Sequence, residues 1–298
     1  MNKNFSLNEI KNILDKKVIG QESAKKLLTV AFYEQQEKIN SIQNNKNYDY
    51  FLTYNHSSLL LGPEGCGKTL LFNELLNIFN IPCIKIDAKK SLTKYDLDYL
   101  FKKLYIESNE NLKVAEYGIL FIENIESVIE DNNSLLIDFL KQKNITFNYS
   151  KDVTINFNLN NLLIIAEGVF DEGRFISYPI KNDNYNLLDK KFRTKISFYS
   201  LEPEELSDIL TKTNNSELQY FINEYAKHGI KLEFTDEAIQ KLGYEAYYPN
   251  KNVYSLNDEI LKLMCYLQFY LLGNKNITSC KINSKFIYNH SKDGIELK

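Results

Sequence analysis

Short apolar runs alternate with amphipathic stretches along the chain up to about residue 200. Five runs are short, apolar and bounded by polar residues, and we predict a buried strand at each: 57–61, 83–87, 119–122, 162–166 and 196–199. Between them, apolar residues recur at helical spacing over 70–76, 96–106 and 134–141. Strands separated by helices predict an α/β fold, with a parallel five-stranded sheet lying between helices.

The segment before the first strand is also patterned as a helix. Residues 7–36 predict a helix that is interrupted at 18–21. Its second half would present one apolar face, made of Ala24, Leu27, Leu28 and Ala31. The polar, Asn-rich stretch 38–54 predicts a connecting loop.

The pattern changes after residue 201. Helical spacing recurs over 204–212, 216–228, 236–246 and 256–271, and a short strand is expected around 280–287. A proline at an early helical position, followed by two acidic residues, marks the start of the first of these helices at 202–205. We therefore expect a large domain at 1–200 and a small, mainly helical domain with a terminal strand at 201–298.

Composition excludes several classes of protein. The formal net charge of −3 gives no overall attraction to nucleic acid or to a membrane, and no basic stripe carries interleaved aromatic residues. Four scattered cysteines and three isolated histidines predict neither a disulfide framework nor a zinc site. No apolar run is long enough to span a bilayer, and residues 1–4 do not open a signal peptide. We expect a cytoplasmic protein with no nucleic-acid or membrane partner.

One glycine-rich loop follows the first predicted strand. The octapeptide Gly62-Pro63-Glu64-Gly65-Cys66-Gly67-Lys68-Thr69 fits the phosphate-loop pattern GxxxxGK[ST] at every position. Its glycines let backbone N–H groups surround phosphates, Lys68 reaches the β and γ oxygens, and the Thr69 hydroxyl can hold Mg²⁺. The helix that continues at Leu70 directs its N-terminus at the phosphates. The loop predicts binding of ATP or ADP with Mg²⁺; the alternative is a glycine-rich turn without a ligand.

A second acidic position bears on hydrolysis. In phosphate-loop enzymes a buried strand ends at an acid that holds Mg²⁺, and here the apolar run 118–122 ends at Glu123. Asn124 follows where ring ATPases usually carry a glutamate that polarises the attacking water. An amide cannot take that proton, and loss of a general base costs about 10²–10⁴ in rate. We therefore expect weak or absent hydrolysis, with Glu126 and Glu167 as the nearest alternative acids in the sequence.

Taken together, these motifs resemble the ATPase core of the Clp/HslU family of AAA+ unfoldases, in its ClpX-like form. The segment 14–26, centred on Val18-Ile19-Gly20-Gln21, follows the opening pattern of that family, and 231–239 resembles the start of its helical lid. The resemblance implies that Val18 and Ile19 contact the adenine base. Their alternative role is a helix-capping turn with two core residues. The resemblance also implies self-association, as a hexamer-like ring or a hetero-oligomer, with an unknown protein client.

The chain departs from this family in its loops. Residues 87–100 lack the Gly-aromatic-Val-Gly pore loop and offer only Tyr95 as an aromatic substitute. No tripeptide that would dock a peptidase is visible between residues 170 and 191. Three functions therefore stay open: an ATP-binding protein with weak or absent hydrolysis, a working remodelling ATPase, and a nucleotide-stabilised subunit of a larger assembly.

Two basic positions of the family are also altered. Ser255 stands near the place of the arginine that senses the γ-phosphate. The arginine finger that acts on a neighbouring subunit would fall at Lys195 by register or at Arg193 by chemistry. A lysine would offer a point charge instead of a planar fork. A solvated basic turn at 190–195 is the alternative.

Overall fold

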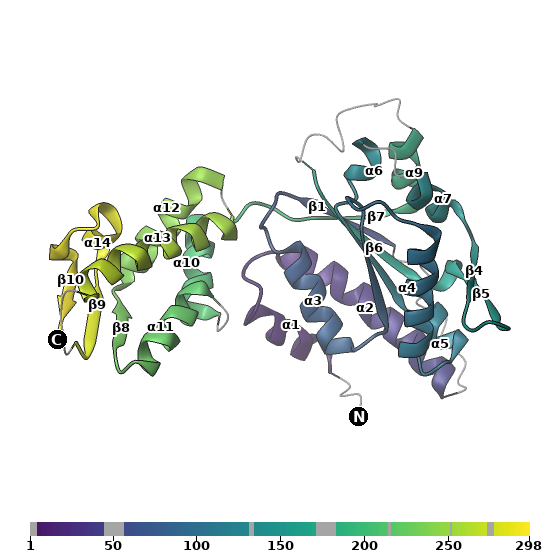
Figure 1. Ribbon diagram of the computed structural model, residues 1–298, viewed down its shortest axis with the longest axis horizontal. Coiled ribbons are helices and arrows are strands. Elements are labelled where there is room, and N and C mark those ends of the chain that lie inside the picture. Colours follow the sequence, from purple (N-terminus) through teal and green to yellow (C-terminus); the bar gives the residue numbers. More distant parts are fainter. Residues whose placement is uncertain are drawn as a thin grey trace. The chain divides into compact units, whose positions relative to one another are not determined.

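The computed structural model describes residues 5–44, 57–130, 134–170, 183–213, 216–250, 252–272 and 277–298 (Figure 1). The chain forms two compact units. Unit 1 consists of Met1–Ile10, Glu22–Pro63 and Lys68–Phe198, and unit 2 consists of Lys11–Gln21, Glu64–Gly67 and Tyr199–Lys298. The division into a large domain at 1–200 and a small domain at 201–298 stays a prediction.

A five-stranded sheet forms the centre of unit 1, in the order β2-β3-β6-β1-β7. Its strands are β1 (Ser58–Gly62), β2 (Cys83–Asp87), β3 (Ile119–Glu123), β6 (Leu163–Val169) and β7 (Thr194–Ser197). Every neighbouring pair is parallel, as expected where a crossover returns the chain between successive strands. The predicted α/β fold with a parallel five-stranded sheet is confirmed.

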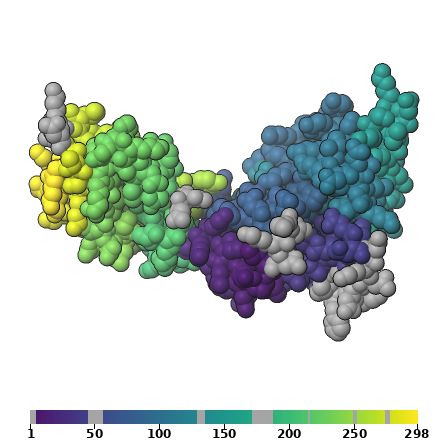
Figure 2. Space-filling model, turned by 90° about the horizontal axis from the view of Figure 1, so that it is seen from below, coloured from purple at the N-terminus to yellow at the C-terminus, as the bar shows by residue number. Residues whose placement is uncertain are grey.

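Helices precede the sheet and connect its strands. They are α1 (Leu7–Asp15), α2 (Glu22–Gln43), α3 (Lys68–Phe79), α4 (Lys94–Glu107), α5 (Leu112–Glu116), α6 (Ser127–Glu130), α7 (Ser134–Lys141) and α9 (Asp183–Lys191), with a 3-10 turn η1 (Leu159–Asn161). A hairpin of β4 (Asn144–Asn148) and β5 (Thr154–Asn158), which the sequence pattern did not predict, stands out from unit 1 in both views (Figures 1 and 2).

Both faces of the sheet are covered, because successive side chains of a strand point to opposite sides. On β3, Leu120 and Ile122 join the buried cluster that includes residues of α4, α7 and α9. Between them, Phe121 points the other way and stacks on Phe72 of α3, with ring centroids 3.8 Å apart. Phe72 in turn meets the edge of Phe32 of α2. The carboxyl ends of the strands are thereby fixed between two packed layers.

Unit 2 combines helices with a small sheet. The elements are α10 (Pro203–Lys212), α11 (Glu217–Lys227), β8 (Lys231–Phe234), α12 (Asp236–Asn250), α13 (Val253–Leu272), β9 (Ser279–Ile282), α14 (Ser284–Asn289), η2 (Lys292–Gly294) and β10 (Ile295–Leu297). The strand order is β10-β9-β8, with β8 and β9 parallel and β9 and β10 antiparallel. The four helices predicted after residue 201 all form.

Three expectations about local structure were wrong. Helix α2 continues to Gln43, where a loop was expected, because Ile39 is buried and keeps the helix packed; residues 45–56 lie outside the described part. Leu27 is 46% exposed and does not belong to the buried face of α2. The expected strand at 280–287 ends at Ile282, since the Asn283 side chain accepts a hydrogen bond from the backbone of the next helix, α14.

The predicted absence of a peptidase-docking loop concerns a region of which 171–182 lies outside the described residues. None of the described helices combines the length and apolar character needed to cross a membrane.

Candidate functional site

The glycine-rich loop connects β1 to α3, and its glycines have positive φ angles that residues with a side chain rarely adopt. At Gly62 φ is +154°, and an added Cβ would lie 2.5 Å from the carbonyl oxygen of Phe198. At Gly67 φ is +98°, although no described atom lies within 4 Å of a Cβ built there. Glycine is therefore required at position 67 by the φ angle. At position 62 it is required by the φ angle and also by the close approach of Phe198.

Lys68 is held under the same loop. Its ammonium nitrogen donates to the carbonyl oxygens of Gly62, at 2.8 Å, and of Pro63, at 2.6 Å. The side chain is only 7% exposed. The Lys68 ammonium group is therefore buried and held against the carbonyl oxygens of the first two residues of the loop.

The other loop positions differ in exposure. Glu64 and Leu70 are exposed, Gly65 and Thr69 are half-buried, and Cys66 is buried.

The Thr69 hydroxyl donates to the carboxylate of Glu167, with its oxygen 2.8 Å from Oε1 and 3.0 Å from Oε2. Glu167 lies near the end of β6 and is 9% exposed. Burial raises the pKa of Glu167 above its ordinary value; the Thr69 hydrogen bond and Lys68 oppose that shift, and Glu123 and Glu126 add to it. The carboxylate therefore lies in a desolvated place beside both phosphate-loop side chains.

Three glutamates gather where β3 and β6 end. Ile122 and Ala166 are register partners, so Glu123 and Glu167 follow at adjacent positions. Glu126 reaches the end of β6, where its Oε2 accepts a hydrogen bond of 3.2 Å from the Val169 backbone. Within the described residues no group of three acidic, His or Cys side chains is arranged to hold a metal by itself. Any cation here needs further oxygens from water or a ligand.

Asn124 is turned toward the neighbouring strand. Its φ of +56° lies in the left-handed region, which asparagine tolerates better than most residues. The side-chain Nδ2 donates to Asp87 Oδ1 at 2.8 Å. Burial would raise the pKa of Asp87, but hydrogen bonds from Asn124 and from the Lys89 backbone outweigh it and hold the pKa below its ordinary value. The amide thus tethers the end of β3 to the end of β2.

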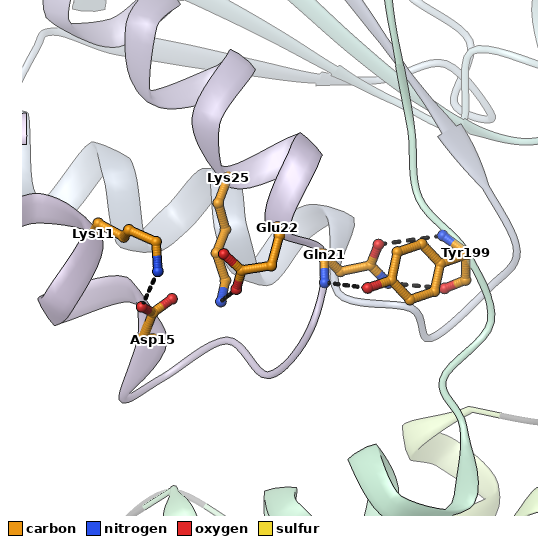
Figure 3. Close-up of polar contacts among 6 residues, drawn as sticks. All are labelled: Lys11, Asp15, Gln21, Glu22, Lys25 and Tyr199. Atoms are coloured by element: carbon orange, nitrogen blue, oxygen red, sulfur yellow. Dashed lines mark hydrogen bonds and ion pairs between the residues drawn. The ribbon is translucent and has the colours of Figure 1, made fainter.

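The segment at 18–21 contacts the loop within unit 2. Val18 is buried and Ile19 is half-buried. Gln21 exchanges hydrogen bonds with the backbone of Tyr199, through Oε1 at 3.2 Å and Nε2 at 2.8 Å, and its own N–H donates to the Tyr199 hydroxyl (Figure 3). The same Nε2 donates to the Cys66 carbonyl oxygen at 3.2 Å. One buried amide therefore joins the opening segment to the phosphate loop.

Asn252 caps the helix that contains Ser255, the residue predicted to stand near the place of the γ-phosphate sensor. Ser255, in the first turn of α13, is 5% exposed. Its backbone N and Oγ both donate to Asn252 Oδ1, at 3.0 and 3.2 Å. Nearby, the Val253 N–H points to the Gly65 carbonyl oxygen at 3.4 Å. Asn252 therefore caps the start of the helix, and Ser255, which donates to it, carries no positive charge.

The basic candidates near β7 differ from each other. Lys195 forms an ion pair with Asp189 of α9. Arg193, two residues earlier, is exposed. Tyr95, the aromatic candidate for the missing pore loop, is 77% exposed in the first turn of α4.

Sequence reasoning singled out the loop and both acidic strand ends, but it did not pair them. It missed the roles of Gln21, Tyr199 and Asp87. A usable signal existed for the acids, because the carboxyl ends of neighbouring parallel strands meet at one edge of a sheet. Nothing in the sequence marks Tyr199 as the partner of Gln21.

Comparisons with known proteins agree with this architecture. Residues 58–167 match AAA, the ATPase family associated with various cellular activities. The ATP-dependent Clp protease ATP-binding subunit ClpX 2 of Wolinella succinogenes is 23% identical over 95% of this chain and 82% of that protein. Subunit ClpX of Treponema denticola is 25% identical over 95% of this chain and 81% of its own length. ClpX of Borrelia duttonii is 24% identical over 94% of this chain and 78% of its own length. Over residues 58–167 this chain is therefore similar to the AAA family of ATPases, and over nearly its whole length it is similar to ClpX proteins.

Proposed function

We propose that this protein binds ATP or ADP with Mg²⁺ in the phosphate loop and hydrolyses ATP weakly or not at all. One observation carries the proposal: a complete loop, with Lys68 bonded to its carbonyls, lies at the same edge of the sheet as Asn124, which replaces the usual glutamate and is bonded to Asp87.

The residues present suit the nucleotide and its cation. Mg²⁺ prefers hard oxygen ligands and usually takes one or two carboxylates together with phosphate oxygens and water. The Thr69 hydroxyl and the Glu123 carboxylate have that chemistry. When bound, the cation neutralises charge on the β- and γ-phosphates. Backbone N–H groups of 64–69 surround the phosphates, and Val18 and Ile19 contact the base.

Weak hydrolysis follows from what the side chains near the loop already do. Asn124 can orient a water but cannot take its proton, and its Nδ2 donates to Asp87. The Glu126 carboxylate accepts a hydrogen bond from the Val169 backbone N–H, and this bond holds the side chain at the end of β6. Near the place of the γ-phosphate sensor, in the first turn of α13, the chain carries Ser255, so no arginine is available at that position to stabilise charge on the γ-phosphate.

Self-association is part of the proposal, because the ClpX-like core implies a ring-like or hetero-oligomeric assembly. In such an assembly the exposed Arg193 is the better trans finger, since Lys195 is already paired with Asp189. Sedimentation velocity with and without ATP tests this point. A monomer under both conditions would leave the nucleotide as a ligand that stabilises one subunit of another complex.

Nucleotide binding and single-turnover hydrolysis, measured on the same preparation, test the central claim. The wild-type protein should bind Mg–ADP and Mg–ATP, and Lys68→Ala should remove most of that affinity. Lys141→Ala, on an exposed side chain of α7, is the matched control and should bind as the wild type does. No binding by the wild type would defeat the proposal. Fast turnover would instead support the working ATPase.

A further inference from the structure

We propose that Glu167 is a second carboxylate ligand of the nucleotide-bound Mg²⁺, in addition to Thr69 and Glu123. This inference rests on the proposed function, because the cation enters with the nucleotide. It assigns a metal-binding role to the residue at the end of β6, where related ring ATPases often use a neutral side chain to position water.

The spacing between Glu167 and Thr69 fits a shared cation. Both carboxylate oxygens lie within 3.0 Å of the Thr69 hydroxyl oxygen. Two neighbouring ligands of an octahedral Mg²⁺, each about 2.1 Å from the metal, are about 3.0 Å apart. The Thr69 hydroxyl oxygen and a Glu167 carboxylate oxygen therefore already have the separation of adjacent Mg²⁺ ligands. A rotation of the hydroxyl proton away from Glu167 would free both of these oxygens to bind a cation.

The neighbouring strand supplies the other carboxylate. Glu123 and Glu167 lie at adjacent positions on β3 and β6, one step beyond the Ile122–Ala166 register pair. Glu126 belongs to the same group of acids, but its Oε2 is bonded to the Val169 backbone. Two carboxylates and one hydroxyl are thus available for the cation. The third glutamate, Glu126, is instead bonded to the backbone of Val169, the last residue of β6.

Charge and burial give this arrangement a consequence. Glu167 is 9% exposed, and a buried carboxylate beside other carboxylates is costly without a cation nearby. It would also repel the phosphates of a nucleotide that arrives without metal. Nucleotide binding should therefore depend on the divalent cation more strictly than it would with an amide at this position.

Glu167→Gln and Glu126→Gln provide the test, since each removes one charge from the same group of acids. Mn²⁺ is the probe, and its binding to the protein–ADP complex is followed by electron paramagnetic resonance. Glu167→Gln should lower Mn²⁺ affinity by about tenfold or more, the range seen when support for a metal site is lost. In EDTA the same variant should bind ADP more tightly than the wild type. Glu126→Gln should change both affinities much less.

Two outcomes would overturn the inference. One is an unchanged Mn²⁺ affinity in Glu167→Gln, whether or not metal-free ADP binding becomes tighter, and the other is an equal loss of Mn²⁺ affinity in both variants. Glu167→Asp is a second variant that keeps the carboxylate, and it serves if Glu167→Gln folds poorly. It should retain more Mn²⁺ affinity than Glu167→Gln. Failure of the wild type to bind Mg–ADP would be a different result, since it would defeat the proposed function itself.

Discussion

At the scale of single residues, the neighbourhood of Asn124 explains more than its missing acid. The side chain combines a left-handed backbone with a bond to Asp87, so it fixes where β3 ends relative to β2. A glutamate at this position would have to adopt the same backbone beside an aspartate. Restoring the family residue therefore carries a structural cost that the sequence does not reveal.

Asn124→Glu should reduce the free energy of unfolding by roughly 1–3 kcal/mol, from left-handed strain and the lost hydrogen bond. Urea denaturation measures this, and Asn124→Gly separates the causes, because glycine relieves the backbone strain and lacks the amide. Turnover of Asn124→Glu should rise only if the rest of the site is competent. A variant as stable as the wild type would show that the tether to Asp87 contributes little.

Glu167 predicts an unusual dependence of stability on pH in the absence of metal and nucleotide. Its folded-state pKa is raised above the ordinary value of 4.5, mainly by burial. Between these two pKa values the folded state binds more protons than the unfolded state, so stability falls as pH rises through the window. Glu167→Gln should therefore be more stable than the wild type at neutral pH, and the difference should shrink as pH falls toward 4.5. Chemical denaturation at several pH values measures it; a constant difference would contradict the assignment.

At the scale of elements, the turn between α1 and α2 is organised by one side chain. Gln21 has a φ of +57° and bonds to the backbone of both Tyr199 and Cys66. Gly20 beside it has a φ of +66°, and an added Cβ would lie 2.2 Å from Glu205 Oε1. The turn is therefore shaped by contacts with distant residues more than by local preference.

Gln21→Ala should loosen this turn and weaken binding of ADP more than binding of inorganic pyrophosphate, because the base contacts that we propose for Val18 and Ile19 would depend on the turn. Loss of buried hydrogen bonds, each worth about 1 kcal/mol, makes a tenfold loss of ADP affinity a reasonable expectation. Gln36→Ala, on the half-buried side of α2, is the control. Equal losses for ADP and pyrophosphate would place the effect on the phosphate loop instead.

At the scale of the whole molecule, the chain forms two compact units, and residues 62–63 and 68–69 of the loop are assigned to unit 1 and 64–67 to unit 2. A ligand that binds only the folded state stabilises it by mass action. We therefore expect a nucleotide that binds at this loop to raise the stability of the folded protein.

ADP with Mg²⁺ should stabilise the wild type by about 2.7 kcal/mol when its concentration is one hundred times the dissociation constant. Differential scanning calorimetry measures the shift in Tm, and Lys68→Ala should lose most of it. Thermal stability that ignores millimolar nucleotide would mean that the loop has lost its ligand.

The sheet was predictable because five apolar runs with intervening helices leave few topologies. The hairpin of β4 and β5 was not predicted, although polar and apolar residues alternate in both strands, because each strand is only five residues long. Strand β8 was not predicted either: residues 231–239 resemble the start of a helical lid, and only pairing with the distant β9 makes 231–234 a strand. Local pattern cannot reveal a pairing across more than forty residues.

The sequence by itself determined the fold class, the phosphate loop and the family resemblance, because periodicity and a fixed motif are local properties. The tertiary structure decided which side chains meet: Thr69 with Glu167, Asn124 with Asp87, and Gln21 with Cys66. These contacts depend on strand order and on chain reversal between elements, and neither is written in the spacing of residues. The resemblance predicted a nucleotide site, whereas the local arrangement of its acids became visible only once the strands were placed side by side.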